Sequence, residues 1–226
     1  MIKKTYFGRK ILIVVSVLYF ASVISSIIFI FYFQNRLIET SAIDSAQLLS
    51  DALTEFRTMY TAKVVEKVKN HPDINVTHEY ETIKNAIPLP ATLSMELGEK
   101  IGRSLSGAET YLYSPYPFPW RIESGGLRDE FRREAWNALN ENPDIPYFKI
   151  TQYKGQKAIR FATADLMRPE CVNCHSNHPD TPKTGWKTGD VRGVLEIIHN
   201  IEIITDHHKT GIQGLYLFAA LLTLFG

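Results

Sequence analysis

A run of 23 residues without a charge, from Ile11 to Phe33, constrains the fold of this chain more than any other feature. At a rise of about 1.5 Å per residue, a helix of this length spans a hydrocarbon core of roughly 30 Å. A cleavable signal peptide usually has a shorter apolar core, of about 7–15 residues, and ends at a small-residue cleavage site. The run 11–33 therefore predicts an uncleaved transmembrane helix, with a signal peptide as the alternative.

The distribution of positive charge predicts the orientation of this helix. Four basic residues precede the run: Lys3, Lys4, Arg9 and Lys10. Directly after the run, Arg36 is the single basic residue. The excess of positive charge indicates that residues 1–10 are cytoplasmic. We therefore expect a protein of the cytoplasmic (inner) membrane whose following residues are periplasmic or extracellular.

A second stretch without charge, Gly211–Gly226, has 16 residues, which is short for a span. We expect residues 206–226 to be the start of a second transmembrane helix that the sequence cuts short. The residues between the two stretches, 34–205, then form one extracytoplasmic domain. The net charge is +1 and the charges are well mixed, so no basic stripe suggests nucleic acid as a partner. The membrane is the expected partner instead.

Hydrophobic periodicity predicts an α+β domain with a long N-terminal helix and a small antiparallel sheet. Apolar residues recur at steps of three and four over Ser41–Lys69, which is the spacing of one helical face. The other expected elements are helices at 91–105 and 127–140 and strands at 147–152, 157–164 and 191–199. Three prolines within 111–121 favour extended chain, and the proline-rich stretch 165–188 is expected to be a loop.

The only two cysteines of the chain lie in the sequence Cys171-Val-Asn-Cys174-His175. This pattern is typical of covalent c-type haem attachment. The two residues between the thiols suit the separation of the two porphyrin vinyl groups, and the adjacent imidazole is aimed at the iron. Haem is attached outside the cytoplasmic membrane, where the orientation argument independently places the motif. The motif therefore predicts one covalent haem c, with Cys171 and Cys174 as thioether residues and His175 as an iron ligand.

Three other interpretations of the motif are open. A redox-active cysteine pair usually opens a helix after a strand in a thioredoxin-like unit, and no βαβ pattern precedes this motif. A structural disulfide that closes so short a loop contributes little stability. A zinc site would need His178 as a fourth ligand, and four ligands within eight residues are cramped beside ordinary finger spacings. His178 is better suited to a propionate contact or a hydrogen bond within the loop.

The stretch DLMRPECVNCHSNHPDTPKTGWKTGDVRGVLEI, residues 165–197, resembles a family of extracytoplasmic c-type haem domains with a PAS-like fold. The likeness extends back through FRTMYTAKVVEKV and PFPWR and covers most of residues 45–200. Members occur alone as small haem proteins, and as input modules ahead of histidine kinases, nucleotide cyclases and chemoreceptors. The resemblance implies a haem-binding sensor domain, with Cys171 and Cys174 as thioether residues and His175 as the proximal ligand.

The sixth iron ligand is open. Some members of the family draw it from the N-terminal helix as cysteine or methionine, and this chain has no third cysteine, so Met59 is the matching candidate. Met59 as a filler of the core, Tyr60 as a weaker ligand, and a water-occupied site that favours gas binding are the alternatives. Three further candidates could contact the haem propionates or pair within the fold: Arg121, Trp186 and Arg192.

Two functions from different classes remain. The first is the redox- or gas-sensing input domain of a signal transduction protein, acting as a homodimer, with an effector such as a cyclase or kinase expected after Gly226. The second is a membrane-tethered monohaem cytochrome for electron transfer to a redox partner. No nucleophile–base constellation and no phosphate-binding glycine loop stands out in the sequence, so enzyme activity within the 226 residues is not expected.

Overall fold

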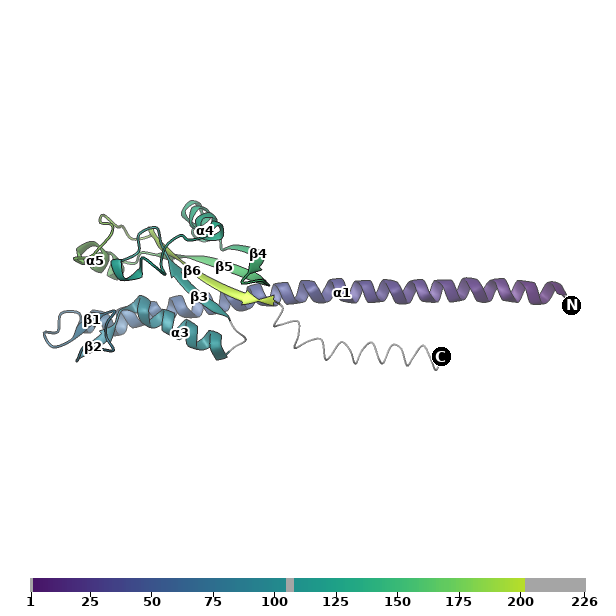
Figure 1. Ribbon diagram of the computed structural model, residues 1–226, viewed down its shortest axis with the longest axis horizontal. Coiled ribbons are helices and arrows are strands. Elements are labelled where there is room, and N and C mark those ends of the chain that lie inside the picture. Colours follow the sequence, from purple (N-terminus) through teal and green to yellow (C-terminus); the bar gives the residue numbers. More distant parts are fainter. Residues whose placement is uncertain (1, 105–107, 202–226) are drawn as a thin grey trace. The chain divides into compact units, whose positions relative to one another are not determined.

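The computed structural model describes residues 2–104 and 108–201 (Figure 1). The chain divides into two units, residues 1–41 and residues 42–226. Helix α1 covers Ile2–Tyr60, and in the first unit the apolar side chains of 11–33 are largely exposed. Among the described residues one helical stretch, Gly8–Val68, is long and apolar enough to cross a membrane, a test that a signal sequence also passes. The expected second membrane helix, 206–226, lies outside the described residues.

The second unit is a domain of helices and strands. After α1 the chain forms one π-helical turn, η1 (Thr61–Val65), and a last helical turn, α2 (Glu66–Val68). The remaining helices are α3 (Pro90–Ser104), the 3-10 turn η2 (Pro119–Arg121), α4 (Glu130–Glu141) and α5 (Pro169–Asn177). The strands are β1 (Asn75–Thr77), β2 (Ala86–Pro88), β3 (Glu109–Tyr113), β4 (Tyr147–Tyr153), β5 (Gln156–Leu166) and β6 (Val191–Asn200).

Strands β3, β6, β5 and β4 form one antiparallel sheet in that order, and β1 and β2 form a separate parallel pair. The β4–β5 hairpin turns at Lys154 and Gly155, whose φ angles of 51° and 80° place both residues in the left-handed region. Two consecutive residues of this kind are typical of a tight hairpin turn. The expected α+β fold, with a small antiparallel sheet and a long N-terminal helix, is confirmed.

Side-chain alternation along β5 explains how the layers pack, because successive residues of a strand point to opposite faces of the sheet. On one face, Thr163 makes a 2.7 Å hydrogen bond with Ser50 of α1. On the other face, Ala162 joins Phe131 and Leu139 of α4 in the hydrophobic core. The central strands therefore lie between α4 and the domain part of α1.

Helix α1 meets the sheet through a stripe of buried residues that recur at steps of three and four, as one helical face requires. The stripe continues through η1 and consists of Ala42, Ala46, Ser50, Leu53, Arg57, Thr61 and Val65. Its first residues are small, which permits close approach of the helix to the strands. A helix over Ser41–Lys69 was expected and is found, but the expected apolar face was wrong: of its repeating residues, Leu49, Leu53, Phe56, Tyr60, Val64 and Val68, only Leu53 belongs to the buried stripe.

Helix α3 packs closely on β3 through three small buried residues, Ser94, Gly98 and Gly102. A Cβ atom at Gly98 would lie 2.9 Å from the side chain of Thr110. A Cβ atom at Gly102 would lie 1.9 Å from the carbonyl oxygen of Ala108. Both distances are shorter than real Cβ contacts, so a side chain at Gly98 would displace Thr110, and one at Gly102 would displace the backbone.

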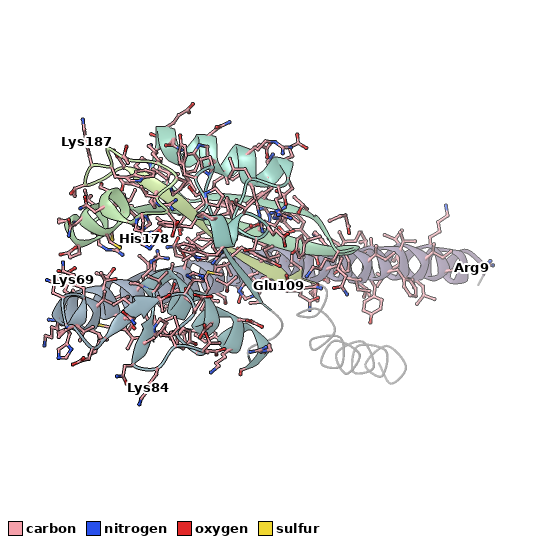
Figure 2. All side chains as sticks on the ribbon, turned by 60° about the vertical axis from the view of Figure 1, so that its left-hand side comes forward. Arg9, Lys69, Lys84, Glu109, His178 and Lys187 are labelled. Carbon is pink, nitrogen blue, oxygen red and sulfur yellow. The ribbon has the colours of Figure 1, made fainter. Side chains whose placement is uncertain are left out.

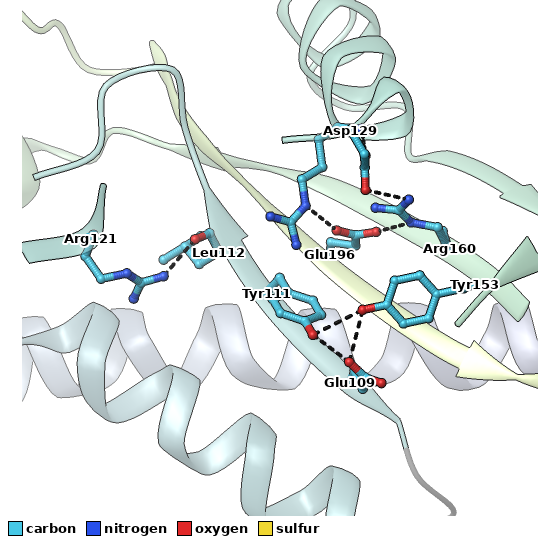
Figure 3. A network of polar contacts seen from close by, with 9 residues as sticks. Glu109, Tyr111, Leu112, Arg121, Asp129, Tyr153, Arg160 and Glu196 are labelled. Carbon is cyan, nitrogen blue, oxygen red and sulfur yellow. Dashed lines mark hydrogen bonds and ion pairs between the residues drawn. The ribbon is translucent and has the colours of Figure 1, made fainter. Parts of the chain in front are cut away.

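A buried ion cluster ties α4 to the sheet (Figure 3). Glu196 of β6 is completely buried and accepts hydrogen bonds from Arg160 at 2.5 Å and from Arg132 at 3.3 Å. Arg160 also pairs with Asp129 at 2.9 Å, and Asp129 caps α4 by accepting from the backbone N–H of Arg132. The Glu196 carboxylate is therefore paired with arginines from two elements, Arg132 of α4 and Arg160 of β5.

The structure differs from the sequence-based expectations in several places. Residues 111–121, expected to be extended chain without helix, include the end of β3 and the 3-10 turn η2. The stretch 165–188 was expected to be a loop, but it contains α5, which begins with Pro169 at its first position and Glu170 in its first turn. Both residues favour a helix N-terminus, and the prolines further along obscured this local signal. The helix expected from residue 127 begins at Glu130, after its Asp129 cap. The β1–β2 pair was not expected, because strands of three residues have no periodicity to detect.

Candidate functional site

The motif lies on the short helix α5 (Pro169–Asn177). Residues three apart are neighbours on one helical face, so Cys171 and Cys174 present their thiols to the same side. Both cysteines are free thiols, Cys171 half-buried and Cys174 exposed. The helix follows β5 and precedes β6, but these strands are adjacent and antiparallel. The setting is therefore not the parallel βαβ unit of a thioredoxin-like redox pair.

The His175 imidazole is held in a defined position behind the two thiols. The Arg192 Nε–H donates to His175 Nδ1 at 3.1 Å, and the Phe118 ring lies 5.4 Å away between centroids. The Thr181 hydroxyl donates to the His175 carbonyl oxygen at 2.5 Å and so ties the following loop to α5. Burial, and next the Arg192 charge, lower the pKa of His175 from 6.5 to about 4. The neutral imidazole, which is the form that binds metals, is therefore favoured.

Arg192 is aimed at His175 by an irregularity in the sheet. Asp165 pairs with Gly193 and Leu166 pairs with Val191, so Arg192 is the extra residue of a β-bulge. Bulges re-aim side chains next to functional sites. The Arg192 guanidinium also donates to the Ser114 hydroxyl at 2.8 Å.

Two aromatic rings flank this guanidinium. Its central carbon lies 5.7 Å from the Phe118 ring centroid and 5.4 Å from the Trp186 ring centroid. Trp186 is buried, and the Lys183 ammonium lies 3.9 Å over its ring. The structure thus brings together three of the residues singled out in the sequence, His175, Trp186 and Arg192.

Aromatic side chains from the PFPWR segment form a shell beside α5. Phe118 and Trp120 stack with centroids 4.7 Å apart, and the His178 ring meets them edge-on at 5.2 Å and 5.6 Å. His78, from the loop between β1 and β2, stacks on the other side of Trp120 at 4.2 Å. His178 Nδ1 accepts from the backbone N–H of Asp180, so His178 serves a hydrogen bond within the loop. Large flat rings therefore border the motif on one side.

The end of the N-terminal helix lies on another side of α5. Figures 1 and 2 show α5 over this end, with His178 and Lys69 labelled in Figure 2. Although the Cys174 residue is exposed, protein atoms around its thiol displace water and raise the pKa, as does the neighbouring Cys171, and the charges of Lys69 and Glu66 also act on the thiol. The π-helical turn Thr61–Val65 directly precedes α2. Single π turns within α-helices are frequent at functional sites.

No hydrogen bond, ion pair or ring contact joins Met59, Tyr60 or Arg121 to the motif among the described residues. Met59 is 50% exposed, and at about 100° per residue it lies on the face of α1 opposite its second neighbours Arg57 and Thr61 of the buried stripe. The Tyr60 hydroxyl donates to the Pro88 carbonyl oxygen at 3.0 Å, and burial raises its pKa. Arg121 donates to the Leu112 carbonyl oxygen at 3.0 Å (Figure 3).

Two charged residues near the motif were missed by sequence reasoning. Arg57 of α1 is 4% exposed and donates from Nη2 to Asp165 Oδ1 at 2.6 Å. Nothing local in the sequence links residues this far apart, because Arg57 lies outside the apolar repeat that the sequence shows. Within residues 2–104 and 108–201, no three or more His, Cys, Asp or Glu side chains are grouped to hold a metal ion. The zinc interpretation therefore has no converging ligand set there.

Comparison with known proteins places the chain in a family. A model of the Tll0287-like family matches residues 34–199, well over half of the chain. The chain belongs to the Tll0287-like family. This confirms the resemblance seen in the motif stretch 165–197. Among solved structures, the crystal structure of the cyanobacterial heme-protein Tll0287 is similar at 12% identity with a TM-score of 0.48, covering 68% of this chain and 91% of that chain. No curated protein matches the chain.

Proposed function

We propose that this chain carries one covalent haem c on α5. The observation that carries the proposal is the placement of two free thiols and one imidazole within Cys171–His175, with Phe118 behind the imidazole. Each thioether would form by addition of a Cys S–H across one vinyl group, with the hydrogen going to the vinyl carbon, so no net oxidant or reductant is needed. Membership of a family that includes a heme protein supports the same cofactor.

The surrounding residues fit such a group. The aromatic rings of Phe118 and Trp120 suit a flat macrocycle, and His175 is neutral and oriented. Arg57 is buried, yet its Nε and Nη1 have no hydrogen-bond partner among the described residues. Unpartnered buried donors of this kind are expected where an anionic or polar group is still to be bound. When bound, haem supplies an iron that changes oxidation state and binds small diatomic ligands.

We propose that His175 would ligate the haem iron and that the chain would supply no second iron ligand, so that an external ligand could bind. The buried stripe of α1 and η1 presents Arg57, Thr61 and Val65 and no Met, His or Cys. Met59 faces away from this stripe and is half exposed. Tyr60 is engaged with Pro88. These positions favour a water-occupied site that exchanges for a gas such as carbon monoxide or nitric oxide.

We further propose that the domain is the extracytoplasmic input of a membrane-bound sensor. Helix α1 both carries the apolar run 11–33 and docks on the sheet beside the motif, so one helix connects the anchor with the site. A ligand can shift this helix only if it binds two arrangements with different affinity. A homodimer with paired N-terminal helices is the expected assembly.

Absorption spectra of the full chain, purified from a host that matures cytochromes, test the proposal. We expect a Soret band, haem that stays on the denatured polypeptide, and loss of both in Cys171→Ser/Cys174→Ser. Carbon monoxide should shift the reduced spectrum of the wild type and of Met59→Ala equally. A colourless wild type with no added porphyrin mass would disprove haem attachment. A low-spin spectrum that is lost in Met59→Ala, but kept in the control Met95→Ala, would establish Met59 as ligand.

A further inference from the structure

A groove away from the motif lies between α3 and β3. It is lined by side chains of α3, by the first residues of β3 and by Arg121 of η2, and its volume is about 660 Å³. Sites for small molecules commonly have volumes of about 300–1,000 Å³. None of the rings beside the motif, such as Phe118, Trp120 and His178, lines this groove. The groove is therefore separate from the proposed haem-attachment site.

Arg121 brings a guanidinium to the groove without an anion to balance it. Its Nη2 donates to the Leu112 carbonyl oxygen at 3.0 Å on β3, which is an edge strand of the sheet (Figure 3). Its Nε is buried without a hydrogen-bond partner, and no carboxylate pairs with Arg121 among the described residues. A guanidinium stays charged in proteins, and charges removed from water are normally paired. This side of the groove is therefore suited to an anion.

Glu96 of α3 is the opposite case. The Tyr80 hydroxyl donates to Glu96 Oε2 at 2.7 Å, and no basic side chain pairs with Glu96 in the part of the chain that the structure describes. The other two carboxylates that line the groove already have cations. Glu99 pairs with Arg103 at 2.8 Å, and Glu109 pairs with a lysine of the β4–β5 turn at 2.7 Å. The groove thus combines a guanidinium that has no anion with a carboxylate that has no cation.

This distribution of charge narrows the class of ligand. Three carboxylates line the groove, so a phosphate or a dicarboxylate would be repelled. A simple monocarboxylate would pair with Arg121 and leave Glu96 without a cation. An amino acid carries both groups that the groove calls for. Its carboxylate matches the parallel N–H donors of a guanidinium, and its ammonium group can pair with Glu96.

We propose that the groove between α3 and β3 binds a small zwitterionic amino acid, with Arg121 holding its carboxylate and Glu96 holding its ammonium group. This inference does not depend on the haem. The groove and the motif are nevertheless connected, because the segment that carries Arg121 also places the Phe118 ring 5.4 Å from the His175 ring between centroids. A bound amino acid would give the domain an input besides the one proposed for haem.

Isothermal titration calorimetry of the full, detergent-solubilised chain tests the role of Arg121. The probes are the standard amino acids and γ-aminobutyrate, and we expect at least one of them to bind. Arg121→Gln should weaken that binding at least about tenfold, because a charge-assisted pair is lost while the amide can still donate to Leu112. Arg128→Gln is the matched control, because Arg128 also donates to a backbone carbonyl, that of Ile122 at 3.2 Å, but is exposed and does not line the groove. The control should bind as the wild type does.

A second comparison tests Glu96 through the ammonium group. The wild type should bind the amino acid at least about tenfold more tightly than the corresponding carboxylic acid without its amine. Glu96→Gln should abolish this preference. Glu81→Gln is the control, because Glu81 also accepts from the Tyr80 hydroxyl, at 3.5 Å, but does not line the groove. A preference that persists in Glu96→Gln would overturn the assignment of Glu96.

The absence of binding by every probe, or equal binding in Arg121→Gln and the wild type, would overturn the proposal. If Arg121→Gln does not accumulate, Met95→Trp replaces it, because Met95 lines the groove and the larger ring should fill it and block binding. Unchanged binding in Met95→Trp would also overturn the proposal. The competing anion for Arg121 is a haem propionate. A changed haem spectrum in Arg121→Gln, with no amino acid bound by the wild type, would assign the guanidinium to that group instead.

Discussion

Glu196 provides a sharp test of what holds the domain together. It is completely buried, and it faces Arg160 and Arg132, which are both buried as well (Figure 3). Burial raises the pKa of Glu196 in spite of the two arginines, so the cluster itself is weak evidence of net stabilisation. The loss of stability in Glu196→Gln would arise because the guanidinium groups of Arg132 and Arg160 are left without a buried counter-charge. Removing one partner of a buried ion pair costs about 3–5 kcal/mol.

We expect the lower end of this range, a loss of about 3 kcal/mol in the free energy of unfolding. The amide that replaces the carboxylate in Glu196→Gln would still accept one hydrogen bond, and Arg160 would keep Asp129 at 2.9 Å. Urea unfolding of the detergent-solubilised chain can be followed by tryptophan fluorescence, because all three tryptophans, at 120, 136 and 186, lie in this domain. The midpoint should shift without a change of slope.

Glu109→Gln is the matched control for this experiment. Glu109 pairs with Lys154 at 2.7 Å, and the two side chains are 33% and 62% exposed. Glu109 also accepts from the Tyr111 and Tyr153 hydroxyls, which a glutamine amide oxygen can still do, so the expected loss is below about 1 kcal/mol. Replacing Glu196, Arg132 and Arg160 together with methionine should recover most of the loss, because no buried charge is then stranded. Equal stabilities of Glu196→Gln and Glu109→Gln would refute this account of the cluster.

Two further predictions concern packing and pH. Gly102→Ala should destabilise the domain by about 1–3 kcal/mol or more in the same urea assay, because its Cβ would meet the Ala108 carbonyl oxygen at 1.9 Å. In the control Gly126→Ala the new Cβ meets nothing closer than 3.9 Å, so this variant should be neutral. Similar unfolding midpoints for the two variants would contradict the close approach of α3 and β3. His199 is buried, its Nε2 has no partner among the described residues, and burial lowers its pKa below 6.5. The unfolded chain therefore binds the extra proton, and stability should fall as the pH drops below 6.5. His199→Phe should make that decline shallower, and an unchanged pH profile would count against the buried neutral histidine.

Much of the architecture follows from local patterns. The three- and four-residue steps over Ser41–Lys69 predicted a helix, although the face that docks on the sheet is rotated from the apolar face that the steps indicated. The hairpin at Lys154–Gly155 and strand β6 (Val191–Asn200) were also expected, because turn residues and β-branched runs are local signals. The motif Cys171–His175 is likewise a property of five consecutive residues. These features can be predicted from the sequence without knowledge of any long-range contact.

The surroundings of His175 could not be predicted in this way. The bulge that aims Arg192 depends on the register between β5 and β6, and the helical conformation of α5 was hidden among prolines. Met59 matched the family by its position along the chain, and only the packing of α1 places its side chain opposite the buried stripe. The position of a residue in the sequence determines which helix it belongs to. The packing of that helix determines whether its side chain faces the domain or the solvent.

The amino-acid order thus specifies the anchor-like run, the periodic helix and the attachment motif, because each is encoded by neighbours in the chain. The partners of the imidazole emerge only on folding. Arg57 and Asp165 are 108 positions apart and meet at 2.6 Å because a helix and a strand are packed in one particular register. Burial then excludes the water molecules that would otherwise solvate the two charged groups, so each group depends on the other as its partner.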